Sequence, residues 1–526
     1  MTSRAEPAEG RNPADAMWEW AIGLTLLLTA LRLAAIRLSP LQLYADEAQY
    51  WAWSQHLAFG YFTKPPLLAW IIRLTTLMGD AEPLVRVSSP LLHAAAAIFV
   101  FLAANRLYEA RTALFALLTY ALMPAVQLGS FVVSTDTPMV ACLAAALWAY
   151  VALQQTGRGA WRPALGLGLT LGLAFLAKYA ALYAVAGIAL HLIASRRARQ
   201  AWRPATIAAA LGAFALVIAP NLAWNAMNGF AAAHHVASEA AWGGARKGGV
   251  LAAATFLASQ FGVFGPIPFA ALIWGGALWL AARRRRRAPQ DGSDKTSDAS
   301  DGLLLAWTIP PLAIVLVQAF IAGAKANWAA AAFAPGSILA AAWLLRWGRP
   351  RLLIAVLAAQ ALLALAGLVA VTQPQLLDRF GLSNALKGVR GGRELTAMIV
   401  AQAQAQAQPP SAPLTAVAID DRELFNLAAY YGRAYFGVTG PPLKAWLPGP
   451  YPANEGELTA PLTVANGARV LAASHDGANT PAMRSQFQTA GETAIGNVWL
   501  DRKHHRSVAM FVGEGFKGAA AATPSQ

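Results

Sequence analysis

The stretch Tyr44–Trp70, YADEAQYWAWSQHLAFGYFTKPPLLAW, holds an acidic pair, a belt of aromatic residues and a Lys-Pro-Pro turn. It stands between two long apolar segments. Aromatic side chains gather where a chain leaves a membrane, so this arrangement indicates a loop at a membrane surface. Whether that interpretation holds depends on the composition of the segments around it.

The composition favours a polytopic α-helical membrane protein. The chain has 526 residues, of which 57% are hydrophobic and 13% charged, and its mean hydropathy is +0.43. A soluble chain of this length could not bury so much apolar surface. The formal net charge of +15 would suggest nucleic acid for a soluble protein. Most arginines, however, fall in short gaps between apolar runs, as the positive-inside rule requires, so we predict a lipid bilayer and no nucleic acid as a partner.

Apolar stretches of spanning length recur along the first two thirds of the chain. We count 163–193 as two spans, and Pro65–Met78 as one more span or a re-entrant pair, which predicts about 11–13 transmembrane helices. The stretches lie at 17–38, 84–105, 111–128, 134–153, 163–193, 204–224, 250–281, 303–322, 327–346 and 351–372.

The arginine clusters predict the orientation. With a cytoplasmic N-terminus, the clusters between spans, including Arg283–Arg287, all fall on the cytoplasmic side. The same alternation sends the loop 39–83 and the tail after Thr372 to the outer side. Every chemically suggestive residue is then on one face of the membrane.

Four domains are predicted from these patterns. Residues 1–16 form a disordered cytoplasmic N-terminus and 17–372 a transmembrane domain; 373–413, which includes AQAQAQAQPPSAP, is a linker region, and 414–526 form a small outer α/β domain. Within the transmembrane part, the acidic, Ser-rich segment DGSDKTSDASDG (291–302) is expected to be a flexible cytoplasmic loop.

Polar residues at the predicted span ends are the candidate site. Asp46 and Glu47 follow a span directly, where a carboxylate could serve as a general base or, equally, as a helix cap in an aromatic belt. Lys64 precedes Pro65 and Pro66, which end any helix there and present the ammonium to a lipid phosphate or a headgroup.

Further along, Asp136 in STDTP could cap a helix or serve a site. Lys178 interrupts an apolar run, which favours a functional role over a tight turn; Lys325 in GAKANW has the same two interpretations. Together, these lysines and carboxylates predict a site for a lipid-linked phosphate with an acid or base. His234 and His235 are expected to be ordinary loop residues. No metal site is predicted.

With these residues, the sequence resembles the bacterial dolichyl-phosphate-mannose-protein-mannosyltransferase-like glycosyltransferases (family 39/83, GT-C fold). This family includes the aminoarabinose and galacturonic acid transferases of lipid A and lipopolysaccharide core. The most specific match is DEAQYWAWSQHLAFGYFTKPPLLAWIIRL, followed in order by STDTPM, FLAKYAALY and KANWAAAAFA. In the tail, DDRELFNLAAYY, Trp446 and NEGEL also match. Thr63 stands where the aminoarabinose transferases have an acidic residue, which favours the galacturonosyl-type branch.

The resemblance implies inverting transfer of a sugar from a polyprenyl-phosphate donor to a periplasmic acceptor, most simply lipid A or lipopolysaccharide core, at the bacterial inner membrane. It implies no cofactor. It leaves a requirement for a divalent metal open but does not indicate one. Asp46 and Glu47 would be catalytic, and Lys64, Lys178 and Lys325 would bind the donor phosphate. Asp136, Tyr50, Trp53 and Tyr61 would bind substrate. The alternatives are a protein O-mannosyltransferase-like enzyme and a lipid-linked sugar transporter or flippase.

Overall fold

The computed structural model describes residues 13–156, 160–230, 248–285, 292–381, 383–409, 411–449, 451–501 and 504–518. They form two compact units, neither continuous in sequence. The first unit takes its described residues from Met1–Ala34, Val87–Gly229 and Val236–Leu368, and the second from Ala35–Arg86, Phe230–His235 and Val369–Gln526. Two long helices, α1 (Pro13–Leu38) and α18 (Pro350–Thr372), run across the boundaries between the units.

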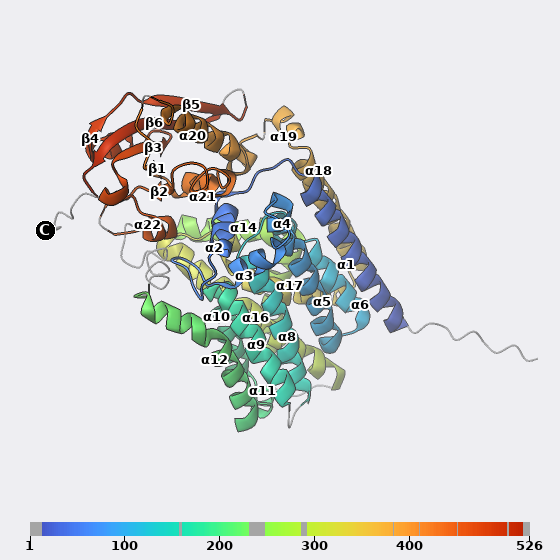
Figure 1. Cartoon of the computed structure of the whole chain (residues 1–526). Helices are drawn as coiled ribbons and strands as arrows, with labels where there is room; N and C mark the ends of the chain where they lie inside the picture. Colours follow the sequence, from blue (N-terminus) through green and yellow to red (C-terminus); the bar gives the residue numbers. More distant parts are fainter. Residues whose placement is uncertain are drawn as a thin grey trace, which may run out of the picture. The chain divides into compact units, whose positions relative to one another are not determined.

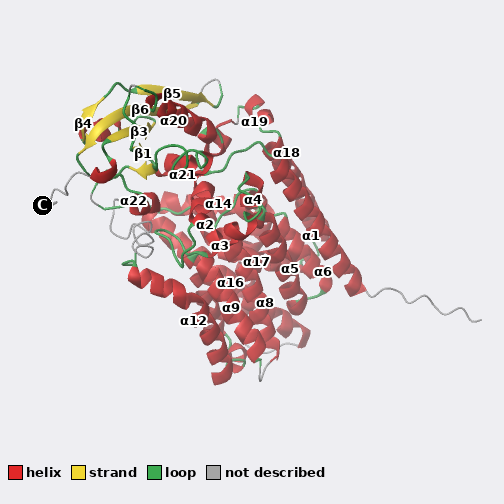
Figure 2. Cartoon of the chain, viewed as in Figure 1, coloured by secondary structure: helices red, strands yellow, loops and turns green. Residues whose placement is uncertain are grey.

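The first unit is helical throughout its described part (Figure 2). Besides α1 and α18, its elements are α5 (Ser88–Leu107), α6 (Ala110–Ala121), α7 (Pro124–Gly129), α8 (Asp136–Thr156), α9 (Trp161–Ala177), η1 (Tyr179–Ala181), α10 (Leu182–Ala194), α11 (Arg196–Gln200), α12 (Pro204–Met227), α14 (Val250–Phe264), α15 (Pro266–Arg285), α16 (Gly292–Ala322), η2 (Ala326–Ala332) and α17 (Phe333–Arg346).

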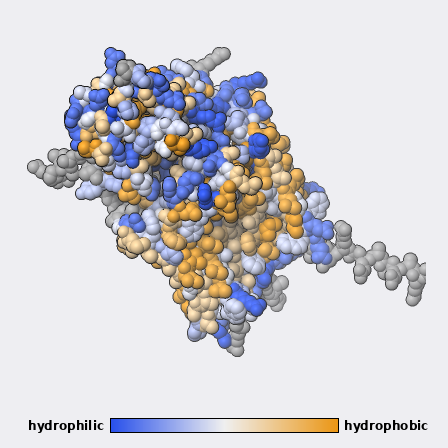
Figure 3. All heavy atoms as spheres, viewed as in Figure 1, coloured by the Kyte–Doolittle hydropathy of each residue, from blue (hydrophilic) through white to orange (hydrophobic). Residues whose placement is uncertain are grey.

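Eight helices among the described residues are long and apolar enough to cross a membrane, and three apolar helices of 10–17 residues accompany them. This agrees with the predicted polytopic α-helical class. Apolar side chains gather on the surface of the helical unit in Figure 3, where large side chains such as Leu26, Leu216 and Leu362 are more than 60% exposed. Exposed apolar side chains of this kind can face the hydrocarbon core of a bilayer, which offers no hydrogen-bonding partners.

Small residues let these helices approach closely. α9 packs between α8 and α12 (Figure 1). A Cβ added to Gly168 of α9 would collide with the backbone oxygen of Ala210 in α12, and one added to Gly172 would meet Val217 at 2.8 Å. Close backbone approach through small residues is the usual way helices associate in lipid, where burial of apolar surface gives no drive.

Three predicted stretches differ from the structure. The single span 250–281 is two helices, because Gly265 has a φ of +94° and Pro266 cannot continue α14. The span 111–128 is divided into α6 and α7 ahead of Pro124. Pro65–Met78 contains α3 (Leu67–Thr75), whose nine residues are too few to cross a bilayer. In contrast, 163–193 forms two helices, as expected.

The segment 291–302 was expected to be a flexible loop, and this is wrong, since α16 begins at Gly292; its cytoplasmic side stays a prediction. Asp301, near the end of this segment, is 2% exposed and accepts hydrogen bonds from Arg346 Nη1 (2.6 Å) and Tyr108 Oη (2.6 Å). Partners distant in the sequence therefore anchor this part of α16. At the other end of the chain, α1 begins at Pro13, inside the expected disordered N-terminus, and residues 1–12 lie outside the described residues, as do His234 and His235.

The second unit joins the loop region after α1 to the C-terminal part of the chain. Its helices are α2 (Ala45–Gln55), α3, α4 (Glu82–Arg86), α19 (Gln375–Arg379), η3 (Ser383–Val389), α20 (Gly392–Gln406), α21 (Arg422–Tyr431), α22 (Glu455–Thr459), η4 (Val464–Asn466) and α23 (Thr480–Ser485). Its strands are β1 (Ala416–Ile419), β2 (Leu443–Ala445), β3 (Arg469–His475), β4 (Phe487–Ala490), β5 (Ala494–Trp499) and β6 (His505–Phe516).

The six strands form one mixed sheet in the order β2-β1-β3-β6-β4, with β5 also paired to β6. β1 is parallel to β2 and β3, and β3 is antiparallel to β6. Alternate residues of β1 enter the two cores: Val417 and Ile419 face α20 and α21, whereas Ala416 and Ala418 face Trp446 and Phe511. The predicted α/β domain is present, and its strands are confined to this part of the chain (Figure 2).

The predicted linker 373–413 contains a helix that belongs to the domain. In α20, Leu395, Ile399 and Ala403 are fully buried in the same core as Val417 and Leu471. Their spacing of four residues puts them on one face of the helix, and Ala and Gln are good helix formers. The helix ends at Gln406, shortly before Pro409.

Candidate functional site

The acidic pair opens helix α2 in the second unit. Glu47 is the third residue of the helix, and its Oε2 accepts a hydrogen bond from the backbone N–H of Tyr44 at 2.9 Å. A carboxylate at this position satisfies one of the N–H groups that a helix start leaves unpaired. The helix-cap interpretation therefore holds for Glu47.

Glu47 is also one half of a buried ion pair. Its side chain is 0% exposed, and it accepts from Arg86 Nε at 2.9 Å and from Nη2 at 2.6 Å. The same guanidinium donates to the backbone oxygens of Leu41 (3.0 Å) and Gln42 (2.6 Å). Arg86 thus ties the chain before α2 to the first turn of α2, which fixes the position of Asp46.

The environment of Asp46 differs from that of Glu47. Its side chain is 42% exposed, and its Oδ1 accepts from Arg422 Nη1 at 2.9 Å. Arg422 is the first residue of α21, and it also donates to Gln49 Oε1. Of the two acidic side chains, Asp46 is the one that solvent or substrate can reach.

The aromatic residues form a buried support. Tyr50, Trp53 and Tyr61 are 6%, 5% and 3% exposed, and the rings of Trp53 and Tyr61 stack at a centroid distance of 4.6 Å. The hydroxyl of Tyr61 donates to the backbone oxygen of Trp53 at 3.0 Å, and burial raises the pKa of Tyr61 to about 12. These contacts hold the loop after α2 against the helix.

Lys64 lies in the turn that follows. It is half-buried, between buried Thr63 and Pro65, and its backbone oxygen accepts from the N–H of Tyr61 at 3.1 Å. The N–H of Phe62 donates to Glu455 Oε2 of α22 at 2.6 Å. The C-terminal part of the second unit therefore contacts the Lys-Pro-Pro turn as well as Asp46.

We expect Glu455→Gln to raise the thermal unfolding temperature of the protein at pH 8. Burial raises the pKa of the Glu455 carboxyl, and the N–H of Phe62 only partly opposes this rise. The stabilisation linked to a raised carboxyl pKa is complete below the unfolded-state pKa of about 4.3 and is lost as the pH rises through the folded-state value. Glutamine keeps an oxygen for Phe62 and does not ionise. Unfolding in detergent at several pH values checks this.

The difference between the Gln variant and the wild type should shrink toward pH 4; a difference that is the same at every pH would contradict the prediction. Glu455→Ala is the matched control. It removes the acceptor of the Phe62 N–H and should cost about 1–3 kcal/mol near pH 4, where the wild-type carboxyl is protonated. The cost should be smaller at pH 8, because alanine also removes the ionised group.

A second polar cluster lies in the first unit. Asp136, the first residue of α8, accepts from Lys178 Nζ at 2.7 Å through Oδ1 and from Asn327 Nδ2 at 2.7 Å through Oδ2. The side chains of Asp136 and Lys178 are 18% and 19% exposed. Lys178 interrupts the helical run between α9 and η1, and Lys325 is exposed just before η2. Two of the predicted residues are thus joined in one ion pair.

Polar side chains continue from this ion pair into α12. Tyr179, next to Lys178, donates its hydroxyl hydrogen to Asn221 Oδ1 at 3.3 Å and accepts from Asn225 Nδ2 at 3.2 Å. Asn221 and Asn225 are 1% and 5% exposed. Buried amides in an otherwise apolar helix are costly unless they are paired, and here Tyr179 satisfies them.

Sequence reasoning found both members of the Asp136–Lys178 pair, as well as Asp46 and Glu47, but it missed the other polar partners of these carboxylates. Arg86 and Arg422 were not singled out, although Arg422 stands in the motif DDRELFNLAAYY. Asn327 lies two residues from Lys325, so GAKANW held a signal for it. For Arg86, the sequence offers no local signal.

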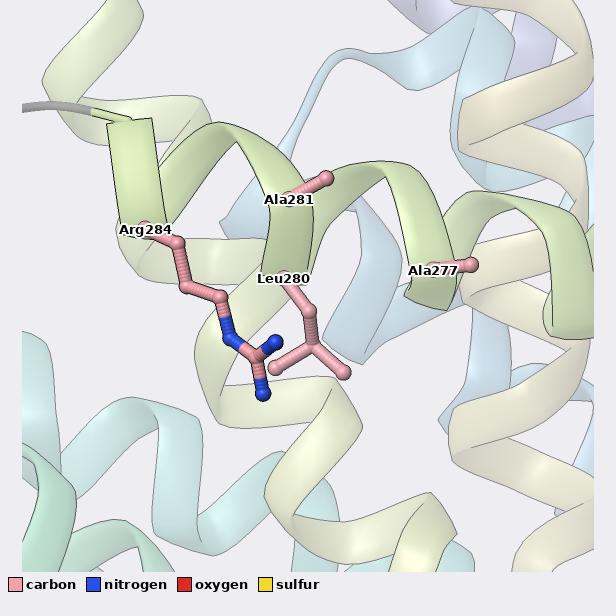
Figure 4. A pocket seen from close by; sticks show the side chains of 4 residues that line it. All are labelled: Ala277, Leu280, Ala281 and Arg284. Atoms are coloured by element: carbon pink, nitrogen blue, oxygen red, sulfur yellow. The ribbon is translucent and has the colours of Figure 1, made fainter.

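A pocket of about 370 Å³ lies elsewhere in the first unit, against α15. It is lined by Ala277, Leu280, Ala281 and Arg284, and Leu280 and Arg284 project from the same side of the helix (Figure 4). Among the described residues, Arg284 is the one charged residue that lines it, and none that lines it carries a carboxylate. The described lining therefore offers no acid or base of the kind that a transfer reaction needs.

Comparison with known proteins supports the predicted resemblance. Residues 63–224 match the family described as dolichyl-phosphate-mannose-protein mannosyltransferase; this range includes Lys64, Asp136 and Lys178. The lipid A galacturonosyltransferase RgtD of Rhizobium johnstonii is 37% identical over 331 residues, which are 61% of this chain. The matched region spans 65% of the length of RgtD.

The fold is that of a solved membrane protein. The crystal structure of ArnT from Cupriavidus metallidurans bound to undecaprenyl phosphate has a TM-score of 0.61 at 17% identity and covers 94% of this chain and 98% of that chain. Its apo form gives 0.60, with 93% and 98% covered. The chain is a multi-pass membrane protein with the ArnT-like GT-C fold, and its resemblance to the dolichyl-phosphate-mannose-protein mannosyltransferase type of glycosyltransferase is confirmed.

Proposed function

We propose that this protein transfers a sugar, with inversion, from a polyprenyl-phosphate donor to lipid A or lipopolysaccharide core. The observation that carries the proposal is the geometry of Asp46. Its carboxylate is part-exposed at the start of α2 and held by Arg422, in a chain 37% identical to a lipid A galacturonosyltransferase. A carboxylate of known position that substrate can reach is what a general base requires.

In the proposed reaction, the acceptor hydroxyl oxygen attacks the anomeric carbon while the bond from that carbon to the phosphate oxygen breaks. Asp46 takes the hydroxyl proton, and the polyprenyl phosphate leaves with the electron pair. The leaving group is already an ionised phosphate, so cations that stabilise the developing charge supply most of what it needs. We assign that role to Lys64, which belongs to the same unit as Asp46. For Lys178 and Lys325, which belong to the first unit, the role stays a prediction from the sequence.

The remaining residues have supporting roles in this proposal. Glu47 positions Asp46 through its buried pair with Arg86 rather than touching substrate. Asp136 orients Lys178 through the 2.7 Å ion pair. Tyr50, Trp53 and Tyr61 are buried, so we propose that they maintain the shape of the loop after α2, against which substrate would bind.

We also propose that the protein lies in the bacterial inner membrane, with Asp46 and the C-terminal domain in the periplasm. The arginine clusters between the helices support this orientation, since basic residues stay on the cytoplasmic side. Examples are Arg196–Gln200, which forms α11 with three arginines, and Arg283 and Arg284 at the end of α15. A lipid A acceptor would be reached from the same outer side.

Protein O-mannosyl transfer is the second candidate, because the family that matches residues 63–224 carries that description. It needs the same donor chemistry and a similar base. The two candidates differ only in the acceptor.

The test is mass spectrometry of lipid A, core oligosaccharide and glycoproteins from cells without the gene and from cells complemented with it. Loss of one hexuronic acid, hexose or pentose from a glycolipid, restored by complementation, is the expected result. Loss of hexose from a protein would favour the second candidate. Unchanged glycans in all fractions would refute transfer.

A further inference from the structure

Three consecutive residues after β1 carry charged side chains, and each has a different set of partners. Asp420 and Asp421 follow the carboxyl end of β1, and Arg422 begins α21. β1 is the strand at which the sheet order reverses, with β2 on one side and β3 on the other. At such a reversal, the loops at the carboxyl ends of parallel strands diverge, and side chains there commonly serve a site.

The two aspartates fix the backbone beside Arg422. Asp420 accepts from Ser474 Oγ (2.7 Å), from the N–H of His475 (2.9 Å) and from Asn479 Nδ2 (2.9 Å), which ties it to the end of β3. Asp421 Oδ1 accepts from the N–H of Leu424 at 2.8 Å and so caps α21. Arg422 is therefore presented from a rigid strand-to-helix junction.

The guanidinium of Arg422 is directed at helix α2. Its Nη1 donates to Asp46 Oδ1 at 2.9 Å and also to Gln49 Oε1, one turn further along α2. Asn426, one turn along α21, donates to the same Gln49 oxygen at 3.3 Å. α2 and α21 pack together within the second unit. Two residues of each helix thus share one hydrogen-bonded network around the carboxylate of Asp46.

We propose that Arg422 is a positioning residue for the transfer reaction, through which the C-terminal domain holds the carboxylate of Asp46 in its reactive orientation. The proposal rests on the proposed function. A carboxylate at the start of a helix can adopt several side-chain rotamers, and a charged hydrogen bond from a fixed guanidinium selects one of them. Correct placement of a reacting group is worth large factors in rate, and an error of about 1 Å can cost about 100-fold.

Several charged or titratable groups surround the pair. Glu423 and Tyr50 act on Arg422, and Tyr44 lies in the field of Asp46, Arg422, Glu423 and Arg506. Of these groups, Arg422 is the one bonded to Asp46. Removal of Arg422 should therefore lower the rate of transfer, because Asp46 loses the hydrogen bond that orients it.

The experiment measures kcat and KM for purified wild type and Arg422→Met in detergent. The assay uses a polyprenyl-phosphate sugar and lipid A identified as substrates in the glycan analysis. We expect kcat to fall about 10- to 100-fold with little change in KM for the donor. Arg422→Lys, which keeps the charge, should recover part of the loss in kcat.

Arg433→Met is the matched control. Arg433 lies just after α21 and packs its guanidinium on the rings of Tyr430 and Trp51, at 4.5 and 5.7 Å from their centroids. It should lose stability but keep a kcat close to that of the wild type. A merely structural role for Arg422 would make the two variants behave alike.

The proposal is overturned if Arg422→Met keeps the wild-type kcat while Asp46→Asn is inactive. If Arg422→Met does not fold, Arg422→Lys decides the question, and a wild-type kcat in that variant overturns the proposal. An active Asp46→Asn protein would instead remove Asp46 from the proposed mechanism, and unchanged glycans in cells without the gene would refute the proposed function. The two failures are therefore distinguishable.

Discussion

Asp46→Asn is expected to lower the rate of sugar transfer by about 10²–10⁴-fold, the usual contribution of a general base. Asparagine keeps an oxygen where Oδ1 accepts from Arg422, so the contact between α2 and α21 survives. What it loses is the ability to take a proton. Because the Asp46 side chain is 42% exposed, the change should leave the thermal unfolding temperature within a few degrees of wild type.

The measurement compares the initial rate of transfer and the unfolding temperature for the same purified samples. Asp80→Asn is the matched control. Asp80 lies in the same unit and accepts from Trp51 Nε1 at 2.8 Å through Oδ1, a contact that Asn can also make. The control should retain most of the activity. Transfer by Asp46→Asn at more than half the wild-type rate would remove Asp46 from the proposed mechanism.

Arg86→Met should have the largest effect on folding. It leaves the fully buried carboxylate of Glu47 without its cation and removes two hydrogen bonds, to Leu41 and Gln42. Breaking a buried ion pair by removal of one partner costs about 3–5 kcal/mol, because an uncompensated charge stays behind. We expect a lower yield of folded protein and a markedly lower unfolding temperature, measured by thermal unfolding in detergent.

Two further variants separate this effect from loss of charge in general. Arg393 pairs with Glu82 while its side chain is 56% exposed, so Arg393→Met should cost less than about 1 kcal/mol. The double variant Glu47→Gln, Arg86→Met removes both charges and should be more stable than Arg86→Met alone. Wild-type stability of the single variant Arg86→Met would show that the buried Glu47–Arg86 pair does not hold the chain before α2 in place.

The fold could be predicted largely because its signals are local. Spanning helices need long apolar runs, and the strands of the C-terminal domain showed as short alternating or apolar segments such as TAVAI. One error arose where a short-range feature decided the outcome: Gly265 and Pro266 divide an apolar run that composition alone joins. Another arose because α20 ends in a repeat that resembled a linker, which concealed the buried face that begins at Leu395.

The candidate site could be predicted only in part, because its charges are paired across the sequence. Asp46 and Lys178 were visible as polar residues that interrupt apolar patterns. Their partners are remote: Arg86 is 39 residues from Glu47, Arg422 is 376 residues from Asp46, and Asn327 is 191 residues from Asp136. No periodicity or motif spacing reports such a pairing. Only the fold brings these residues together.

The split of the second unit along the chain has a consequence for biosynthesis. Asp46 leaves the ribosome early, but Arg422 is made 376 residues later, and Tyr431, whose hydroxyl accepts from the N–H of Leu43, is later still. At about 5–20 residues per second, Asp46 waits roughly 20–75 seconds for its partner. A nascent or truncated chain that stops before Arg422 would already hold most of its membrane helices and still lack a completed acidic loop. In the proposed mechanism, full activity therefore requires that translation has passed Tyr431.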